Sequence, residues 1–290
     1  MQEQKYIVGI DVGGTFTDLL CLNTETQELL SEKVPSIPGS QWKGVLGALE
    51  QLGIDYAEIR AFVHGTTIAT NALLERKGAK TGLVTTDGFR DTLEIGRTRR
   101  LIGGLFDIKF VRPKPLVSRD LRIEVDERVA ADGTVLQSVD DVDFAPIVQQ
   151  FKDKGVEAIA VAFMNAYRNS ENEAKALEKI QALAGDVPVC ASTTVVPEKG
   201  EFERFSTCVL NAYLTPVVTT YLETLAAELE GQGIAAPVSV MGSNGGVMTL
   251  DQAAKFAAGT FLSGPVGGAG GAVRICEMAG VDDCITFDMG

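Results

Sequence analysis

The sequence predicts an α/β protein, and two patterns carry this prediction. Short apolar runs of strand length alternate with segments in which apolar residues recur at helical spacing. From Asp140 onward the order is helix, strand, helix, strand, which is typical of parallel βαβ units. The 290 residues are enough for one large or two ordinary domains with buried cores.

The first third of the chain is expected to begin with three strands joined by turns. The pair Gly13-Gly14 follows the first apolar run, and a polar turn at residues 23–27 follows the second. Two helices come next, because Gly53 and Gly78 stand where a helix C-terminus places glycine. The expected strands are residues 6–10, 15–22, 29–34 and 81–85, and the expected helices are residues 41–52 and 67–76.

The remaining elements follow the alternating pattern. Gly155 ends the first helix of this part, and the apolar strands after it are short. The glycine-rich run at 263–271 opens a helix, and it favours close helix packing through small residues. The expected helices are residues 142–151, 170–183 and 206–229, and the expected strands are residues 158–163, 187–191, 238–241 and 284–287.

Composition excludes several classes of protein. The net charge of −13 and the pI of about 4.6 would repel nucleic acids and anionic membranes, so neither is an expected partner. No apolar run approaches the ~20 residues of a membrane-spanning helix. The single histidine, His64, excludes metal sites built from several histidines. Five scattered cysteines without a C-x-x-C pair indicate reduced, buried thiols and a cytoplasmic protein.

Residues 97–122 differ from the rest of the acidic chain. This stretch has eight basic and two acidic residues and contains Pro113, Pro115 and the pair Gly103-Gly104. One interpretation is a solvated loop, and the other is a surface that faces an anion or another subunit.

The segment Gly9-Ile-Asp-Val-Gly-Gly-Thr-Phe-Thr-Asp18 has the pattern of a phosphate-binding hairpin. Glycines allow backbone N–H groups to approach phosphate oxygens closely, and threonine hydroxyls add further donors. Asp11 would tolerate phosphates only if a cation such as Mg²⁺ lay between them. The alternative is an ordinary β-hairpin with two glycines at its turn.

Other motifs narrow the chemistry further. The P-loop, the G-x-G-x-x-G dinucleotide motif and the G-x-S-x-G motif of hydrolases are all absent from the sequence. Phe287-Asp288-Met289-Gly290 repeats the strand, aspartate, glycine order seen around Asp11, so the two carboxylates could share one metal-phosphate site. His64 precedes a helix start with capping threonines and is either an acid-base group or a structural histidine.

Seven segments together resemble the ATP-dependent hydantoinase/oxoprolinase family, which includes hydantoinase A subunits, 5-oxoprolinase and related subunits of acetone and acetophenone carboxylases. The resemblance implies an actin/sugar-kinase/Hsp70-type, ribonuclease-H-like α/β architecture with an inserted βαβ region. It also implies an N-terminal region at 1–195 and the start of a hydantoinase A-type region at 196–290. The matching segments are residues 9–18, 64–79, 85–97, 113–128, 201–214, 262–272 and 287–290.

The resemblance also implies roles for individual residues. The expected catalytic residues are Asp11, Asp288 and His64, with Mg²⁺ held by the two aspartates. The expected contacts to ATP phosphates are Gly13, Gly14, Thr15, Thr17 and Gly290. The expected substrate-side groups are Thr66, Thr67, Asn71 and Arg97, the last neutralising an oxyanion.

The leading functional hypothesis is ATP-dependent hydrolysis of a cyclic amide, such as a hydantoin, 5-oxoproline or a lactam. Amide resonance protects the ring carbonyl, and phosphorylation of its oxygen would open it to water. The nearest alternative is a carboxylase subunit that acts on a ketone with bicarbonate, because it would use the same activation.

Two further alternatives come from other classes: a sugar kinase and a non-catalytic scaffold of a larger complex. Family subunits are longer and often work with a second large subunit. The chain is therefore expected to be a fragment that stops inside the second phosphate segment, and a hetero-oligomer is expected.

Overall fold

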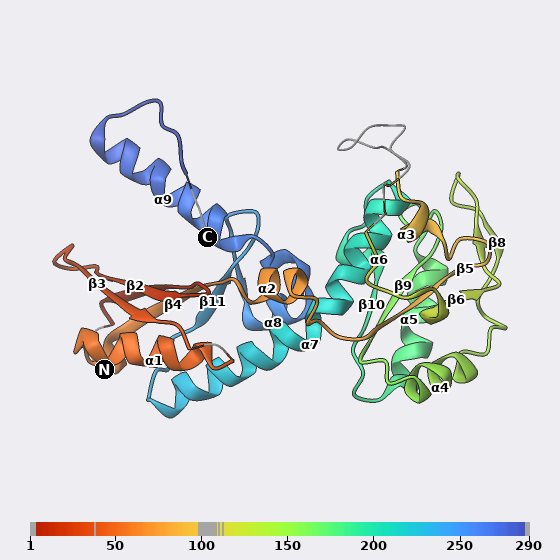
Figure 1. Cartoon of the computed structure of the whole chain (residues 1–290), viewed down its shortest axis with the longest axis horizontal. Helices are drawn as coiled ribbons and strands as arrows, with labels where there is room; N and C mark the ends of the chain where they lie inside the picture. Colours follow the sequence, from red (N-terminus) through yellow and green to blue (C-terminus); the bar gives the residue numbers. More distant parts are fainter. Residues whose placement is uncertain (1–3, 38, 98–108, 110, 112, 288–290) are drawn as a thin grey trace. The chain divides into compact units, whose positions relative to one another are not determined.

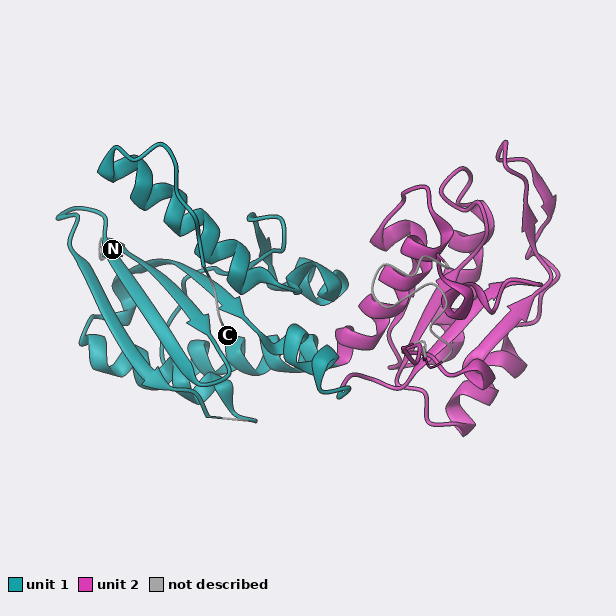
Figure 2. Cartoon of the chain, turned by 45° about the horizontal axis from the view of Figure 1, so that its top comes forward, with its two compact units in different colours: residues 1–77, 217–290 teal, residues 78–216 magenta. Residues whose placement is uncertain are grey.

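The computed structural model describes residues 4–37, 39–97, 109, 111 and 113–287. The chain forms two compact units (Figure 2). Unit 1 combines residues 1–77 with 217–290, and unit 2 consists of residues 78–216. These units divide the chain at other positions than the expected boundary between 195 and 196. That boundary concerns family regions and stays a prediction.

Unit 1 is built on a mixed sheet with the strand order β12-β11-β4-β1-β2-β3 (Figure 1). The first three strands are antiparallel neighbours, as the turns in the sequence predict, whereas β4 and β11 run parallel to β1. The strands are β1 Tyr6–Val12, β2 Phe16–Asn23, β3 Leu29–Pro35, β4 Ile59–Thr66, β11 Val238–Met241 and β12 Val247–Thr249.

Helices cover the sheet of unit 1 unequally. Helix α1 and the second part of α7 lie on one face, and α9 lies on the other (Figure 1). Gly44 of α1 has no side chain because a Cβ there would come within 2.9 Å of Thr17 Oγ1 on β2. The helices are α1 Gln41–Leu52, α2 Ile68–Leu74, α8 Leu250–Lys255 and α9 Ser263–Ala279, with 3₁₀ turns η1 Tyr56–Glu58 and η3 Ala257–Thr260.

Unit 2 contains a fully parallel sheet in the order β10-β9-β5-β6. This confirms the predicted βαβ arrangement. Every residue of β5 and β9 is buried, as both faces of a parallel sheet normally are. The strands are β5 Thr81–Thr86, β6 Arg122–Val125, β9 Ala158–Ala162 and β10 Val189–Ala191, with the hairpin β7 Arg128–Val129 and β8 Val135–Gln137. The helices are α3 Thr92–Ile95, η2 Arg119–Leu121, α4 Ala145–Asp153, α5 Glu171–Ala184 and α6 Ser192–Val195.

Helix α7, Glu201–Gly231, is longer than predicted and belongs to both units. Its interior Pro216 marks the point at which the chain leaves unit 2, close to the place where the chain enters it. There, Ala79 N donates to Tyr213 O at 2.9 Å, and a Cβ on Gly78 would lie only 2.1 Å from the Tyr213 ring. Gly78 therefore serves a close approach to α7 besides following α2.

One predicted strand is wrong. Residues 284–287 form no strand, and Ile285 and Phe287 are almost fully exposed. Apolar sequence alone does not make a strand, because backbone groups need a hydrogen-bonded neighbour, and none of the described strands pairs with this segment.

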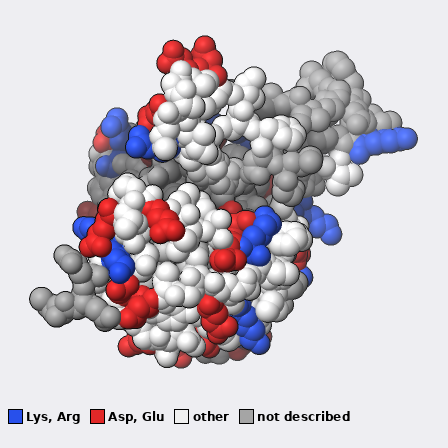
Figure 3. All heavy atoms as spheres, turned by 90° about the vertical axis from the view of Figure 1, so that its left-hand side faces the viewer, with Lys and Arg blue, Asp and Glu red and all other residues white. Residues whose placement is uncertain are grey.

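The described part of the chain has no helix long and apolar enough to cross a membrane. On the face shown in Figure 3, basic and acidic side chains are interspersed.

Candidate functional site

The candidate site lies where parallel strands of unit 1 end together. Strand β4 runs parallel to β1 and pairs Gly65 with Asp11, and β11 runs parallel to β4. Ligands of α/β sheets bind at the carboxyl ends of such strands. Asp11 near the end of β1 and Thr66-Thr67 at the end of β4 therefore come together, as the sequence predicts.

The Asp11 side chain is exposed on the face of β1 opposite the core. Its neighbours Ile10 and Val12 are buried, because successive strand residues point to opposite faces. A Cβ on Gly65 would lie 3.0 Å from Asp11 Oδ1, and a Cβ on Gly264 in the first turn of α9 would lie 3.9 Å from it. Two glycines from distant parts of the chain thus make room around one carboxylate.

The two glycines of the hairpin after Asp11 differ: Gly13 closes the turn with a hydrogen bond, and Gly14 borders free space. Gly13 N donates to Phe16 O at 3.0 Å, and a Cβ on Gly13 would lie 3.0 Å from the same oxygen, so the turn itself requires this glycine. A Cβ on Gly14 would meet no described atom within 4 Å apart from its chain neighbours, and Gly14 and Thr15 are exposed. Packing therefore does not require Gly14, and the open space is available to a ligand.

Thr17 is the predicted phosphate contact that the structure does not bring to Asp11. It is fully buried on the core face of β2, where its Oγ1 lies 3.0 Å from Ser36 Oγ. Ser36 Oγ in turn donates to Gly13 O at 2.9 Å. Since β2 alternates faces, Thr17 supports the hairpin from behind.

The three polar residues predicted for the substrate side fasten the end of β4. Thr66 is buried, and its Oγ1 accepts from Ile68 N at 3.2 Å at the start of α2. Thr67 Oγ1 donates to Val12 O at 3.1 Å and accepts from Asn71 Nδ2 at 3.3 Å. Thr67 and Asn71 are partly exposed and are the better placed for a ligand.

His64 is fully buried on the core face of β4, one residue before Gly65. Its Nε2 lies 2.9 Å from Tyr221 Oη of α7, and its Nδ1 has no hydrogen-bond partner among the described residues. Burial lowers the pKa of His64 to about 3 and raises the pKa of Tyr221, so both side chains are neutral near pH 7. This environment favours the structural interpretation of His64 over the acid-base one.

Arg97 belongs to unit 2 and is paired there. Its Nε and Nη2 donate to Glu203 at 2.6 and 2.5 Å, and this carboxylate raises the pKa of Arg97. Arg119 and Arg122 of the basic stretch are likewise paired with acidic side chains of unit 2, Asp91 and Glu94. These contacts favour a structural role for the described arginines of the stretch.

Asp288 and Gly290 lie outside the described residues, so their shared site with Asp11 stays a prediction. No group of three or more His, Cys, Asp or Glu side chains suited to a metal occurs in the described part of the chain.

Sequence reasoning missed Ser263 and Tyr221. Ser263 is fully buried, and its Oγ donates to Thr66 O at 3.3 Å, which joins the first turn of α9 to the end of β4. Its position directly before the glycine-rich run was the available signal. Tyr221 carried no such signal, since an aromatic residue in a long helix normally indicates only packing.

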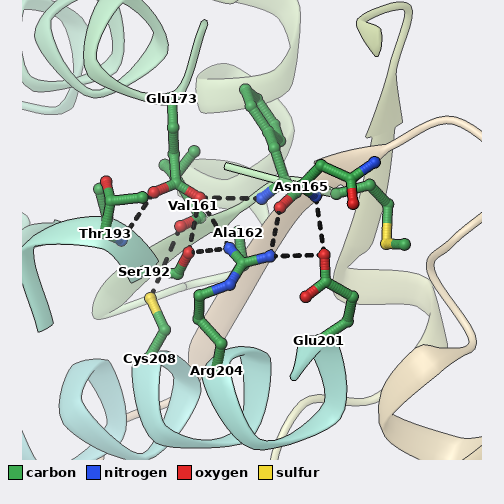
Figure 4. A network of polar contacts seen from close by, with 12 residues as sticks. Val161, Ala162, Asn165, Glu173, Ser192, Thr193, Glu201, Arg204 and Cys208 are labelled. Atoms are coloured by element: carbon green, nitrogen blue, oxygen red, sulfur yellow. Dashed lines mark hydrogen bonds and ion pairs between the residues drawn. The ribbon is translucent and has the colours of Figure 1, made fainter. Parts of the chain in front are cut away.

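A second polar cluster occupies the carboxyl ends of β9 and β10 in unit 2 (Figure 4). Glu173, fully buried, accepts from Ser192 Oγ at 2.7 Å, Thr193 N at 2.7 Å and Phe163 N at 2.9 Å. Arg204 of α7 is also buried, and its Nη1 donates to Ser192 Oγ at 2.5 Å and lies 3.7 Å from Glu173 Oε1.

Arg204 reaches two further acceptors in this cluster. Its Nη2 donates to Phe163 O at 2.8 Å and to Glu201 Oε1 at 2.9 Å. The cluster thus joins the ends of β9 and β10 to helices α5 and α7. Its charged side chains, Glu173 and Arg204, are bound by other groups of unit 2.

Two family models match the chain. The model of the hydantoinase/oxoprolinase N-terminal region matches residues 7–184, and the hydantoinase/oxoprolinase model matches residues 204–290. Among curated proteins, the chain is 35% identical to the caprolactamase subunit alpha of Pseudomonas jessenii, over the whole chain and 43% of that protein. It is 31% identical to the acetophenone carboxylase gamma subunit of Aromatoleum aromaticum, over 98% of the chain and 41% of that protein.

The fold has a close match among solved structures. The crystal structure of the ATP-dependent caprolactamase from Pseudomonas jessenii superposes with a TM-score of 0.87 at 33% identity, over 98% of this chain and 42% of that one. This similarity confirms the expected fold class. The chain spans less than half the length of these curated relatives.

Proposed function

The chain belongs to the hydantoinase/oxoprolinase family, and from this premise we propose that it supplies the first phosphate-binding edge of an ATP-dependent enzyme that hydrolyses a cyclic amide. One observation carries the proposal. The exposed carboxylate of Asp11 lies beside two glycines and next to the open turn at Gly14, in space that packing of the protein does not need.

The proposed reaction answers a chemical difficulty. A lactam, hydantoin or 5-oxoproline carbonyl resists water because the ring nitrogen donates electrons to it. Transfer of the γ-phosphoryl group of ATP to the carbonyl oxygen gives a phosphorylated imidate, whose carbon water attacks readily. The protein's contribution to such a transfer is mainly positioning and charge neutralisation.

The residues of the edge divide this work. Backbone N–H groups at Gly14 and Thr15 would bind phosphate oxygens. Gly13, whose N–H donates to Phe16 O, would shape the turn around the phosphates, and Gly65 and Gly264 leave Asp11 room to act. Asp11 offers the oxygen ligand that Mg²⁺ prefers, so the site fits that ion, and Asp288 and Gly290 are proposed to complete it. Mg²⁺ bound there would neutralise phosphate charge during transfer.

The substrate-side assignments are revised in one respect. Thr67 and Asn71 remain proposed contacts because they are partly exposed at the end of β4. Buried Thr66 and His64 are proposed to hold that strand end in place. Arg97 is still proposed to neutralise the oxyanion of the substrate. To do so, its guanidinium would have to leave Glu203, which it binds in this structure.

The test is phosphate release from ATP by the catalytically complete protein with its partner subunit. Hydantoin, 5-oxoproline and a larger lactam are offered in turn, with Mg²⁺ present. We expect one of them to stimulate ATP turnover and to be opened in equal amount. Absence of stimulation by every cyclic amide would contradict the proposal.

A carboxylase is the second candidate, and one finding favours keeping it: the similarity to the acetophenone carboxylase gamma subunit. In that case an enol oxygen and bicarbonate would be phosphorylated instead of an amide. ATP turnover with a ketone and bicarbonate, compared with turnover on the cyclic amides, separates the two. Assembly with a second large subunit is part of the same proposal, because these relatives are named as subunits. A cytoplasmic location is also proposed, because the five scattered cysteines indicate reduced thiols.

Titration of the present chain with ATP and Mg²⁺ addresses the non-catalytic alternative. Binding that Asp11→Asn removes would exclude a role as a scaffold alone. Phosphorylation of a hexose would instead revive the sugar-kinase alternative.

A further inference from the structure

Two cysteines that are 18 positions apart in the sequence contact each other in unit 2. Cys190 lies in β10, at the edge of the parallel sheet, and Cys208 lies in α7. Their Sγ atoms are 3.8 Å apart, and Cys190 Sγ is also 3.6 Å from Cys208 O. Both thiols are free. The fold therefore brings together two sulfurs that the sequence spacing gave no reason to pair.

The two thiols differ in their surroundings. Cys208 is fully buried, and burial raises its pKa. Its Sγ is within 3.6 Å of Val161 O and 3.8 Å of Cys190 O (Figure 4). Cys190 is partly exposed, and the hydrogen bond from the Cys208 thiol lowers its pKa. Cys190 is thus the partly exposed member of the pair, with the lowered thiol pKa, and Cys208 is the fully buried member, with the raised one.

We propose that Cys190 and Cys208 form an oxidative modification site, at which a hydroperoxide converts the two thiols into an intramolecular disulfide. The Cys190 thiolate attacks the peroxide, the O–O bond breaks, and the sulfur becomes a sulfenic acid while the released oxyanion takes a proton. The Cys208 sulfur then bonds to Cys190 sulfur and expels hydroxide, which leaves as water with the Cys208 proton. The thiols lose two electrons, and the peroxide gains them.

Only a short movement separates the present geometry from the bond. The sulfurs must close from 3.8 Å to about 2 Å, which calls for rotation of the two side chains and a small shift of the edge strand β10. The bond would fasten β10 to α7 one helical turn from Arg204, whose guanidinium binds Ser192 directly after β10. The modification would therefore act on the polar cluster of unit 2. It does not depend on the proposed function.

The other cysteines provide controls. Cys21 is buried in unit 1, whereas the pair belongs to unit 2. Cys276 and Cys284 interact with each other near α9, so they could form a competing disulfide. The experiment therefore uses the chain with Cys276→Ser and Cys284→Ser as its reference protein, in which Cys190 and Cys208 are unchanged.

The reference protein is treated with hydrogen peroxide, and its remaining free thiols are then alkylated. After digestion with trypsin, the peptide masses are measured by mass spectrometry. Cleavage after Lys199 and Arg204 separates Cys190, in peptide 180–199, from Cys208, in peptide 205–255. We expect these peptides to appear joined, with the mass of two hydrogen atoms lost, and to separate again with a reducing agent. Adding Cys21→Ser should change nothing.

Cys208→Ala identifies the order of events. Without the second sulfur, the sulfenic acid on Cys190 should persist, so trapping by a cyclic 1,3-diketone should rise severalfold over the reference. Cys190→Ala should abolish both the joined peptide and the trapping. Circular dichroism melting confirms that each variant is folded, and Cys208→Val replaces Cys208→Ala if the alanine variant is not.

Two outcomes would overturn the proposal. One is oxidation of Cys190 to sulfinic or sulfonic acid in the folded reference protein without any joined peptide. The other is no reaction of either cysteine at a peroxide concentration that oxidises a free thiol peptide fully.

Discussion

The two units treat the same part of a sheet in opposite ways. In unit 1, the carboxyl end of β1 is bordered by glycines, and Asp11 is exposed beside Gly65 and Gly264. In unit 2, the carboxyl ends of β9 and β10 are filled by the protein's own groups, with Glu173 and Arg204 buried among hydrogen-bond partners. The difference is consistent with the proposed ligand site in unit 1, whereas the edge of unit 2 is occupied by contacts within the protein.

The energetics of the two edges differ accordingly. A buried carboxylate is tolerated only with partners, and unit 2 supplies them to Glu173 from α6, from α7 and from Phe163 directly after β9. Asp11 is exposed, so its substitution leaves no buried charge uncompensated. Substitutions should therefore affect function in unit 1 and stability in unit 2, and the following predictions test that contrast.

Asp11→Asn is expected to have the largest effect, on activity. Loss of the carboxylate should lower ATP turnover by the catalytically complete protein by about 10³-fold, with unchanged unfolding. The matched control is Asp18→Asn, because Asp18 stands opposite Asp11 on β2, is exposed and binds Lys33 instead. Equal losses in both variants, measured as phosphate release, would mean that the position of Asp11 is not special.

Arg204→Met is expected to affect stability. It leaves Glu173 buried without its cation, so the free energy of unfolding should fall by about 3 kcal/mol or more. The control is Arg97→Gln, which breaks an exposed ion pair on the same unit and should leave the urea midpoint nearly unchanged. A midpoint for Arg204→Met close to that of Arg97→Gln would show that the cluster is dispensable.

His64 should make the stability of unit 1 depend on pH. Its pKa is about 3 in the folded protein against 6.5 when unfolded, so the unfolded state binds more protons between these values. Stability is therefore complete above pH 6.5 and should fall by about 2 kcal/mol from about pH 7 to pH 5. Urea unfolding of His64→Gln should lack this part of the loss. Parallel pH profiles for both proteins would mean that the folded protein does not lower the pKa of His64, and would contradict this prediction.

The smallest effects are expected from alanine substitutions at two glycines, one in each unit, which compare stability with ATP affinity directly. Gly82→Ala in β5 would place a Cβ 2.8 Å from the Phe151 ring, so unfolding should become easier by about 1–2 kcal/mol. Gly14→Ala meets no described atom apart from its chain neighbours, so stability should stay and ATP affinity should fall by about tenfold. Calorimetric titration and thermal unfolding of both variants measure the two quantities. Lost stability in Gly14→Ala would assign that glycine to the fold.

Much of the fold could be read from local patterns. Apolar periodicity and glycine signals located most strands and helices, and the alternation after Asp140 predicted the parallel sheet of unit 2. The strand at 284–287 was predicted wrongly, because pairing depends on a neighbour that a local pattern does not specify. Helix α7 was predicted too short, since its first turn is polar.

The site was predictable in part. The motif around Asp11 and Gly13 predicted a hairpin, which the structure has between β1 and β2, and its ligand stays a prediction. The threonines after His64 stand at the start of α2, as predicted. Thr17 was assigned to the ligand, although strand alternation turns it to the core. Sequence reasoning left the role of His64 open between acid-base chemistry and structure, and only its burial against Tyr221 shows which environment it occupies.

By itself, the sequence determined the class of fold, the family and the order of the motifs, because these depend on local spacing and residue type. Tertiary structure alone decided which side of each strand faces the core, which glycines border Asp11, and that Cys190 touches Cys208. Such contacts join residues far apart in the chain, and their distances depend on how sheets and helices pack. The residue types limit which reactions are possible, and packing determines which side chains lie close enough to take part in them.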